Sequence, residues 1–375
     1  MINFLASKPE NSKGRLFKEP ENQPYRTVFQ RDRDRIIHST AFRKLKQKTQ
    51  VFINSDSDYY RTRLTHTLEV SQISRTLSRT LSLNEDLSEC IALAHDLGHP
   101  PFGHNGENIL NFKMKDFDGF NHNEQTLRVI NQLEKKYFDF DGLNLTWESL
   151  EGIVKHNGSF KNKVPNEINI YNKLHDLNLD KNPSLEGQIA SISDDVAYNN
   201  HDIDDAIRAN LIDIDQIHEI KYFSNIINKI DKKYINSDKK LLISEIIRSS
   251  INLMVEDIVN QTIKNINKFS INNIENIKNH NSFLVSMSND MKKNCEEIKI
   301  FLYEKVYNNK NLQEKRKKCE LIISCLFDYY LLNFSELPND WKIKETSISK
   351  ERIVCDYIAG MTDNYAYSQY KILYE

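Results

Sequence analysis

Apolar residues recur at intervals of three and four positions along most of this chain, which is the spacing of an amphipathic α-helix. Residues 63–81 show it clearly, with a stripe of Val70, Ile73, Leu77 and Leu81. Alternation with a period of two is scarce, and only 10 glycines and 8 prolines interrupt the 375 residues. The sequence therefore predicts an all-α fold, with helices over 31–49, 63–81, 85–97, 122–136, 147–156, 184–199 and 202–210.

The cysteines and the apolar runs exclude several classes of protein. The five cysteines are scattered and form no C-x-x-C pair, which argues against a disulfide framework or a zinc ribbon. The first 14 residues lack the apolar core of a signal peptide, and no apolar run approaches the roughly 18 residues that span a bilayer. We expect a cytoplasmic protein that does not enter the membrane.

The distribution of charge says less about what the protein binds than the motifs described below. The net charge is only -2, so nothing global suggests a nucleic-acid or membrane surface. Residues 26–50, however, hold eight arginines and lysines against two aspartates. That local excess would suit a polyanionic substrate, and it would equally suit a solvated helix face.

Residues 89–107, ECIALAHDLGHPPFGHNGE, concentrate side chains that bind metals and protons. They are His95, Asp96, His99, His104 and Glu107. An adjacent His–Asp pair on an apolar helix needs a partner, because neither side chain is stable when buried alone. A divalent metal satisfies both, since imidazole and carboxylate suit a borderline or hard cation.

Helical phase indicates which other residues could complete a metal site. His66 heads the inward stripe of residues 63–81, and His95 follows Ile91 by four positions on its own stripe. A further ligand is expected from residues 184–208, where Asp194, Tyr198 and Asp202 recur every four positions. The alternatives are ordinary ones: an inward histidine bonded within the core, or a buried aspartate acting as a cap or an ion-pair partner.

Residues 61–107 resemble the core of the HD superfamily of metal-dependent phosphohydrolases. More closely, the chain resembles the bacterial dGTP triphosphohydrolase-like proteins, a dNTP triphosphohydrolase family. The closer match is carried by HDLGHPPFGH and DDVAYNNHDIDD, and by five stretches at 29–52, 119–130, 152–158, 184–209 and 354–366. Between 211 and 349 only a helical texture is recognised, and no family residue is matched.

The resemblance implies hydrolysis of a dNTP to a deoxynucleoside and inorganic triphosphate, with one divalent metal ion as cofactor: Mn, Mg or Fe, with Zn and Ni as further options. It implies metal ligation by His66, His95, Asp96 and Asp194. It implies catalytic and proton-handling roles for His104, His99, Glu107 and His122. It implies triphosphate contacts by Arg63 and Lys155, and sugar contacts by Tyr198, Asp202 and Gln50. We take His104, which follows the HD pair in the predicted loop, as the first choice of proton donor.

The resemblance also implies self-association, and it allows a dNTP activator at a second site and regulation by single-stranded DNA. The rival functions are another HD phosphohydrolase, such as a nucleotidase or a cyclic-dinucleotide or alarmone hydrolase, and a regulator that binds nucleotide or single-stranded nucleic acid without turnover. We expect three segments: an N-terminal helical segment that contributes to the active site, an HD-type core, and a C-terminal helical extension packed on the core. Their bounds are 1–60, 61–210 and 211–375.

Overall fold

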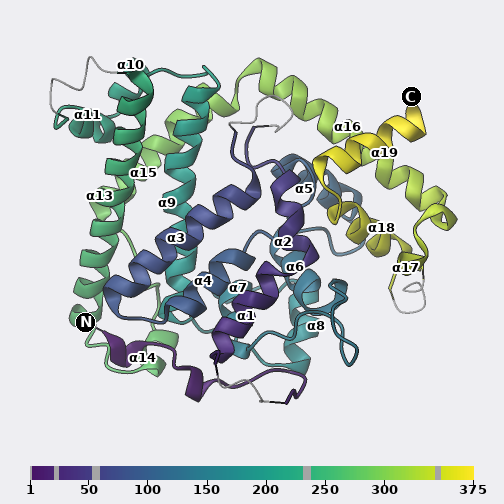
Figure 1. Ribbon diagram of the computed structural model, residues 1–375, viewed down its shortest axis with the longest axis horizontal. Helices are drawn as coiled ribbons and strands as arrows, with labels where there is room; N and C mark the ends of the chain where they lie inside the picture. Colours follow the sequence, from purple (N-terminus) through teal and green to yellow (C-terminus); the bar gives the residue numbers. More distant parts are fainter. Residues whose placement is uncertain (1, 21–24, 53–59, 231–237, 343–347) are drawn as a thin grey trace.

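The described residues fold entirely into helices and connecting loops (Figure 1). The computed structural model describes residues 2–20, 25–52, 60–230, 238–342 and 348–375. Within these ranges two isolated β-bridges are the only strand-like pairings. The predicted all-α class is confirmed.

The helices follow one another with short connections. The N-terminal half contains α1 (Val28–Ile37), α2 (Thr40–Lys44), α3 (Arg63–Leu81), α4 (Glu85–Ala94), α5 (Gly103–Lys113), α6 (His122–Arg128), the π-helical turn η5 (Val129–Leu133), α7 (Trp147–Val154), α8 (Asn166–Leu174) and α9 (Leu185–Arg208). The C-terminal half contains α10 (Ile214–His218), α11 (Lys221–Ile227), α13 (Lys239–Lys268), α14 (Ile274–Lys278), α15 (Asn289–Leu302), the π-helical turn η6 (Tyr303–Tyr307), α16 (Lys310–Leu332), α17 (Asn339–Lys342), α18 (Lys350–Ala359) and α19 (Asp363–Tyr374).

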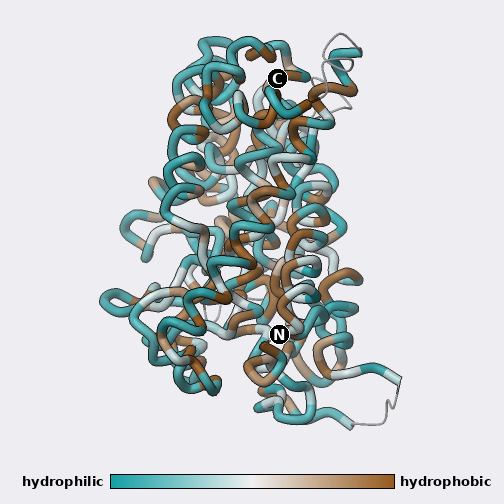
Figure 2. Tube along the Cα trace, turned by 90° about the vertical axis from the view of Figure 1, so that its left-hand side faces the viewer, coloured by the Kyte–Doolittle hydropathy of each residue, from teal (hydrophilic) through white to brown (hydrophobic). Residues whose placement is uncertain are grey.

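Three helices at the centre position the candidate site. α3 packs on α4 and α9, and α4 also packs on α1 and α7. Their apolar stripes meet in one buried cluster that includes Val70, Ile91 and Val196, all fully buried. Burial of a side chain of this size contributes about 1.5–3 kcal/mol relative to leaving it exposed. Apolar residues accordingly concentrate along the inside of the molecule (Figure 2).

A second buried apolar cluster joins α5 to the C-terminal helices α16, α18 and α19. Leu110, Ile323 and Ile358 are fully buried in it. α5 therefore belongs by packing to the C-terminal helices, although it follows α4 directly in the chain. The predicted three-segment division stays a prediction, and residues 53–59, beside its first boundary, lie outside the described residues.

Several helix ends differ from the predicted ones for local reasons. The predicted helix over 31–49 is broken, because the Ser39 hydroxyl accepts a bond from the Phe42 N–H and caps a new helix, α2. α4 ends at Ala94, so the HD pair follows the helix instead of lying within it. His104 is not in a loop either, since α5 begins at Gly103.

The arginines that α1 contributes to the basic stretch 26–50 are paired with carboxylates within the protein. Arg31 and Arg35 both pair with Glu19, and Arg33 pairs with Asp86 and Glu89 of α4. These arginines therefore fasten α1 to its neighbours instead of forming a free basic face. No helix in the described part of the chain has the length and apolar character to cross a membrane.

Candidate metal and phosphohydrolase site

The turn between α4 and α5 brings backbone close to backbone at two glycines. A Cβ on Gly98 would lie 2.2 Å from the Thr126 nitrogen on α6, and one on Gly106 would lie 2.0 Å from the Pro101 carbonyl oxygen. Both distances are far below van der Waals contact, so only glycine fits at either position. The turn is thereby held in a tight shape that brings His95, Asp96, His99, Phe102 and His104 to one cavity.

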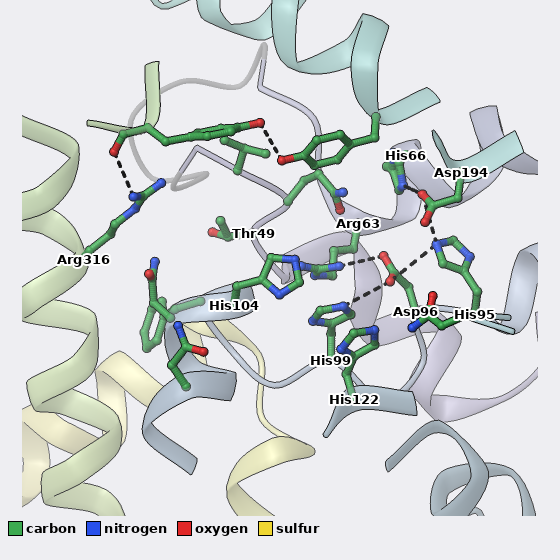
Figure 3. Close-up of a pocket in the computed structure, with 18 of the residues that line it drawn as sticks. Thr49, Arg63, His66, His95, Asp96, His99, His104, His122, Asp194 and Arg316 are labelled. Atoms are coloured by element: carbon green, nitrogen blue, oxygen red, sulfur yellow. Dashed lines mark hydrogen bonds and ion pairs between the residues drawn. The ribbon is translucent and has the colours of Figure 1, made fainter. Parts of the chain in front are cut away.

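The four predicted metal ligands converge at one end of this cavity (Figure 3). His66 Nε2 lies 2.8 Å from Asp194 Oδ1, which joins α3 to α9. His95 Nε2 lies 3.5 Å from Asp96 Oδ1 and 3.7 Å from Asp194 Oδ1. His66, His95 and Asp96 are buried, and the Asp194 side chain is partly exposed to the cavity. We call these four residues the four-ligand cluster.

The unpaired atoms of this cluster fit a metal ion. His95 Nδ1 lies 2.6 Å from the Ala92 carbonyl oxygen, so Nδ1 carries the hydrogen and the Nε2 lone pair faces the cluster. That Nε2 is buried and has no hydrogen-bond partner among the described residues. Donor atoms of His66, His95 and Asp96 lie within 4.8 Å of one another, about twice a metal–ligand bond of ~2.1 Å.

Charges around Asp96 keep the carboxylates of the cluster ionised. Burial alone would raise the pKa of Asp96, but the positive charge of Arg63 outweighs it and holds that pKa well below its usual value. Arg63 is itself buried and donates to Asp96 Oδ2 at 2.7 Å. Burial lowers the pKa of His95, so its imidazole is neutral and able to donate its lone pair.

A second group of ionisable side chains adjoins the four-ligand cluster. Glu107 accepts from His104 Nδ1 at 3.0 Å and from His122 Nδ1 at 2.8 Å. The His99 ring stacks on His122, with centroids 4.0 Å apart, and His99 Nε2 reaches Asp96 Oδ1 at 3.3 Å. Burial would raise the pKa of Glu107, but the bonds from the two histidines outweigh it and lower that pKa. We call His99, His104, Glu107 and His122 the histidine–glutamate cluster.

The four-ligand cluster and the three histidines of the histidine–glutamate cluster line one cavity of about 480 Å³. The C-terminal half closes the far side of it with Tyr303, Tyr307 and Arg316, none of which the sequence suggested. The Tyr307 hydroxyl lies 2.6 Å from that of Tyr198 and also donates to the buried carboxyl of Asp202. Asp202 does not line the cavity itself, and burial raises its pKa to about 7.

The remaining predicted substrate contacts divide into two groups. Arg63 and Gln50 line the cavity. Lys155 does not: it is fully buried, and its ammonium group pairs with Glu151 at 3.1 Å. Its neighbour His156 lines the cavity instead, with Nε2 3.5 Å from Asp194 Oδ2 and its ring stacked on His95.

Asp363, the first residue of the last helix α19, holds two of the segments that line the cavity. One carboxylate oxygen accepts from the Thr49 N–H at 2.8 Å, and the other accepts from the Phe102 N–H at 2.9 Å. Thr49 precedes Gln50, and Phe102 precedes the helix that carries His104. A single buried carboxylate thus positions the N-terminal segment and the start of α5 relative to each other.

Comparison with known proteins agrees with this geometry. A model of the HD domain matches residues 63–199, and a model of the phosphohydrolase-associated domain matches residues 285–372. A deoxyguanosinetriphosphate triphosphohydrolase-like protein of Rickettsia peacockii is 46% identical over 376 residues, covering 100% of this chain and 98% of its own. A protein of the same name from Brucella canis is 45% identical over 381 residues, covering 99% and 94%.

The fold is that of an HD-domain protein, a class of metal-dependent phosphohydrolases, and His66, His95 and Asp96 form a group that could hold a metal ion. Within that class, the chain belongs to the dGTP triphosphohydrolase-like family. The full-length match corrects one sequence expectation, because the similarity does not stop between 211 and 349. The same stretch contributes Tyr307 and Arg316 to the cavity.

Proposed function

We propose that the protein hydrolyses deoxynucleoside triphosphates to a deoxynucleoside and inorganic triphosphate, using one divalent metal ion. The observation that carries this proposal is the meeting of the four-ligand cluster and the histidine–glutamate cluster in one cavity with Arg63. Family relatives named deoxyguanosinetriphosphate triphosphohydrolase-like support the same substrate class. The proposal does not assign a base preference.

His66, His95, Asp96 and Asp194 would hold the metal ion, which supplies charge neutralisation on phosphate oxygens and a lowered pKa for bound water. Arg63 binds the triphosphate through the guanidinium N–H groups that do not donate to Asp96. The same bond holds the guanidinium at a fixed place, so little reorganisation is needed as charge develops on the leaving group. Arg316, across the cavity, adds a second cationic group near the substrate.

The histidine–glutamate cluster is suited to proton transfer. Its outermost member is His104, whose side chain is 66% exposed on the cavity rim and bonded to Glu107 through Nδ1. Because Glu107 is ionised, it holds His104 in the tautomer that carries its hydrogen on Nδ1. We assign His104 as the proton donor to the leaving oxygen, with Glu107 and His122 positioning it.

The tyrosine pair is placed to recognise the sugar. Tyr198 lies one helical turn after Asp194, so a sugar on Tyr198 would leave its phosphates beside the metal ligands. Tyr307 closes the same wall, and the Tyr307 backbone oxygen accepts from Arg316 at 2.9 Å. Two rings fastened to each other and to Asp202 form a stiff surface with little room for a 2′-hydroxyl.

The direct test is an assay of the purified protein with Mn²⁺ or Mg²⁺ against each dNTP alone and all four mixed, with products separated by anion exchange. Inorganic triphosphate and deoxynucleoside in equal amounts support the proposal, and the mixture reveals activation by a second dNTP. Orthophosphate or a linear nucleotide from other substrates would instead indicate another HD phosphohydrolase. Nucleotide binding without any hydrolysis would indicate a regulator.

Removal of the bulky ring at Tyr198 should weaken the preference for deoxyribonucleotides over ribonucleotides. We expect Tyr198→Ala to reduce the dNTP over NTP ratio of kcat/KM by about tenfold, which corresponds to about 1.4 kcal/mol of discrimination. Paired measurements with dGTP and GTP give this ratio. Tyr303→Ala, on the same cavity wall but without a bond to Asp202, is the matched control. An unchanged ratio in Tyr198→Ala would contradict the role assigned to the ring.

Metal addition should stabilise the folded protein, because the four-ligand cluster holds buried atoms that lack partners. Binding only to the folded state adds about 2.7 kcal/mol at a metal concentration 100 times Kd. We therefore expect Mn²⁺ to raise Tm above that of protein treated with a chelator, as measured by calorimetry. An equal increase in His95→Ala would show that the ion binds somewhere else.

A further inference from the structure

A second cavity, of about 240 Å³, lies behind the turn that carries the metal ligands. Its walls come from three distant parts of the chain: α2 and its neighbours, the turn at Leu97 and Gly98 with α6 and η5, and the C-terminal helices α17 and α18. Leu97 and Gly98 separate it from the first cavity, which Asp96 and His99 line on the other side. The four-ligand cluster and the histidine–glutamate cluster have no residue in its lining.

Two lysine ammonium groups face this cavity without a carboxylate partner among the described residues. Lys44 Nζ donates to the Gly360 carbonyl oxygen at 2.6 Å. Lys48 is 3% exposed, and its Nζ donates to the carbonyl oxygens of His99 and Ala359. An ammonium group has three N–H donors, so Lys44 has two left and Lys48 has one.

The acidic residues of the cavity are already engaged elsewhere. Asp356 is paired with Arg128 from outside the cavity. Both oxygens of Glu134 accept backbone N–H groups, at 3.0 and 2.7 Å, from Thr40 and Ala41. Lys135, the third lysine in the lining, is paired with Asp141. Neither acidic residue of the lining is therefore ion-paired with Lys44 or Lys48.

An unpaired acceptor lies in the same wall. Gln125 is 2% exposed, and its Oε1 is buried with no partner among the described residues. A buried acceptor without a donor costs about 1–3 kcal/mol. The lysines of the cavity therefore provide hydrogen-bond donors, and Gln125 Oε1 provides an acceptor that needs a donor. Hydrogen phosphate matches both, because its charged oxygens accept from the lysines and its P–OH group can donate to Gln125. Acetate has the charge but no donor.

We propose that the cavity between α2, the Leu97–Gly98 turn and α18 is a binding site for inorganic phosphate or a phosphate-sized oxyanion, held by Lys44, Lys48 and Gln125. Burial lowers the pKa of Lys44 and lowers that of Lys48 to about 7, so a bound anion would favour the charged lysines. Lys48 also holds the His99 carbonyl, so a bound anion stabilises the turn that carries Asp96 and His99. The site is separate from the substrate cavity, and its occupancy does not depend on hydrolysis.

The chain carries its own reporter for this site. Only two tryptophans are present, and one of them, Trp341, lines the cavity. The other, Trp147, is buried between Lys13 and Lys278 and provides a constant background. Intrinsic fluorescence of the full-length protein can therefore be titrated with sodium phosphate in the absence of nucleotide, against sodium chloride and sodium acetate at equal ionic strength.

We expect a saturable fluorescence change with phosphate and weaker or no saturation with acetate and chloride. Lys44→Met should raise the apparent Kd at least tenfold, and Gln125→Leu should raise it without removing a charge. Lys46→Met is the matched control, because Lys46 lies two positions away and outside the cavity. Arg63→Ala separates this site from phosphate bound in the substrate cavity and should leave the titration unchanged.

Two results would overturn the proposal: no saturable change with phosphate, or a change that Lys44→Met and Lys46→Met affect equally. If Lys44→Met does not fold, the comparison of Gln125→Leu with Lys46→Met decides in the same way. Neither result depends on whether the protein hydrolyses dNTPs.

Discussion

Asp194→Asn is expected to lower kcat/KM for the best dNTP by at least a thousandfold, equivalent to about 4 kcal/mol of transition-state stabilisation. Asp194 is the carboxylate that reaches His66, His95 and His156 together, so it joins α9 to the rest of the cluster. Asparagine keeps the shape of the side chain and can still accept from His66, but it removes the negative charge. A divalent ion then loses one anionic ligand of two.

The neighbouring residue supplies the control for this variant. Asp195 is exposed on the other side of α9, where it pairs with Lys299 at 3.1 Å. Asp195→Asn removes the same charge one position away and should leave kcat/KM within about twofold, as is usual for an exposed ion pair. Metal content by elemental analysis should fall only in Asp194→Asn. Full metal loading and full activity in that variant would remove Asp194 from the site.

The part of the site that sequence anticipates lies where helical phase can be followed. The regular spacing of α3 places His66 on the same stripe as Val70, and the four-residue spacing of α9 places Asp194 and Tyr198 on one face. The predicted break between helices 184–199 and 202–210 is wrong, because the amide groups of Asn199 and Asn200 donate back to carbonyls one turn earlier and α9 continues. Local periodicity is sufficient information for such positions.

The direction of a side chain can no longer be predicted from helical spacing beyond the end of a helix. The substrate side of the site depends on residues at such ends. α7 ends at Val154, so the direction of the next side chains no longer follows from its stripe. Lys155 turns back to Glu151, one turn earlier, while His156 reaches Asp194. Tyr307 ends a π-helical turn, whose wider winding also departs from the 3.6-residue period.

Contacts between distant segments are the second reason why sequence was insufficient. Tyr307 reaches Asp202 across 105 positions, and Asp363 reaches Thr49 across 314. Nothing in either local pattern marks these pairs, because they are created by packing of the C-terminal helices on α5 and α9. Composition likewise could not show that Arg31 and Arg35 in the basic stretch 26–50 both pair with Glu19.

The largest loss of stability is expected from Arg128→Met. Arg128 on α6 is buried and pairs with Asp356 on α18 and Glu167 on α8, so it joins the HD-type core to the C-terminal helices. Methionine retains most of the apolar volume but leaves the Asp356 carboxyl, which is 1% exposed, without a cation. Breaking a buried pair in this way costs about 3–5 kcal/mol in the free energy of unfolding.

Urea unfolding, followed by far-ultraviolet circular dichroism, would measure this loss. Arg79→Met is the matched control, because Arg79 pairs with Glu85 on the surface with 67% of its side chain exposed, and such pairs contribute about 0–1 kcal/mol. The double variant Arg128→Met with Asp356→Leu should recover part of the loss, since it removes the unpaired carboxylate together with its partner. If the single variant is no less stable than Arg79→Met, the buried pair does not hold the two parts together. If the double variant is less stable than the single one, the loss comes from packing and not from the uncompensated charge.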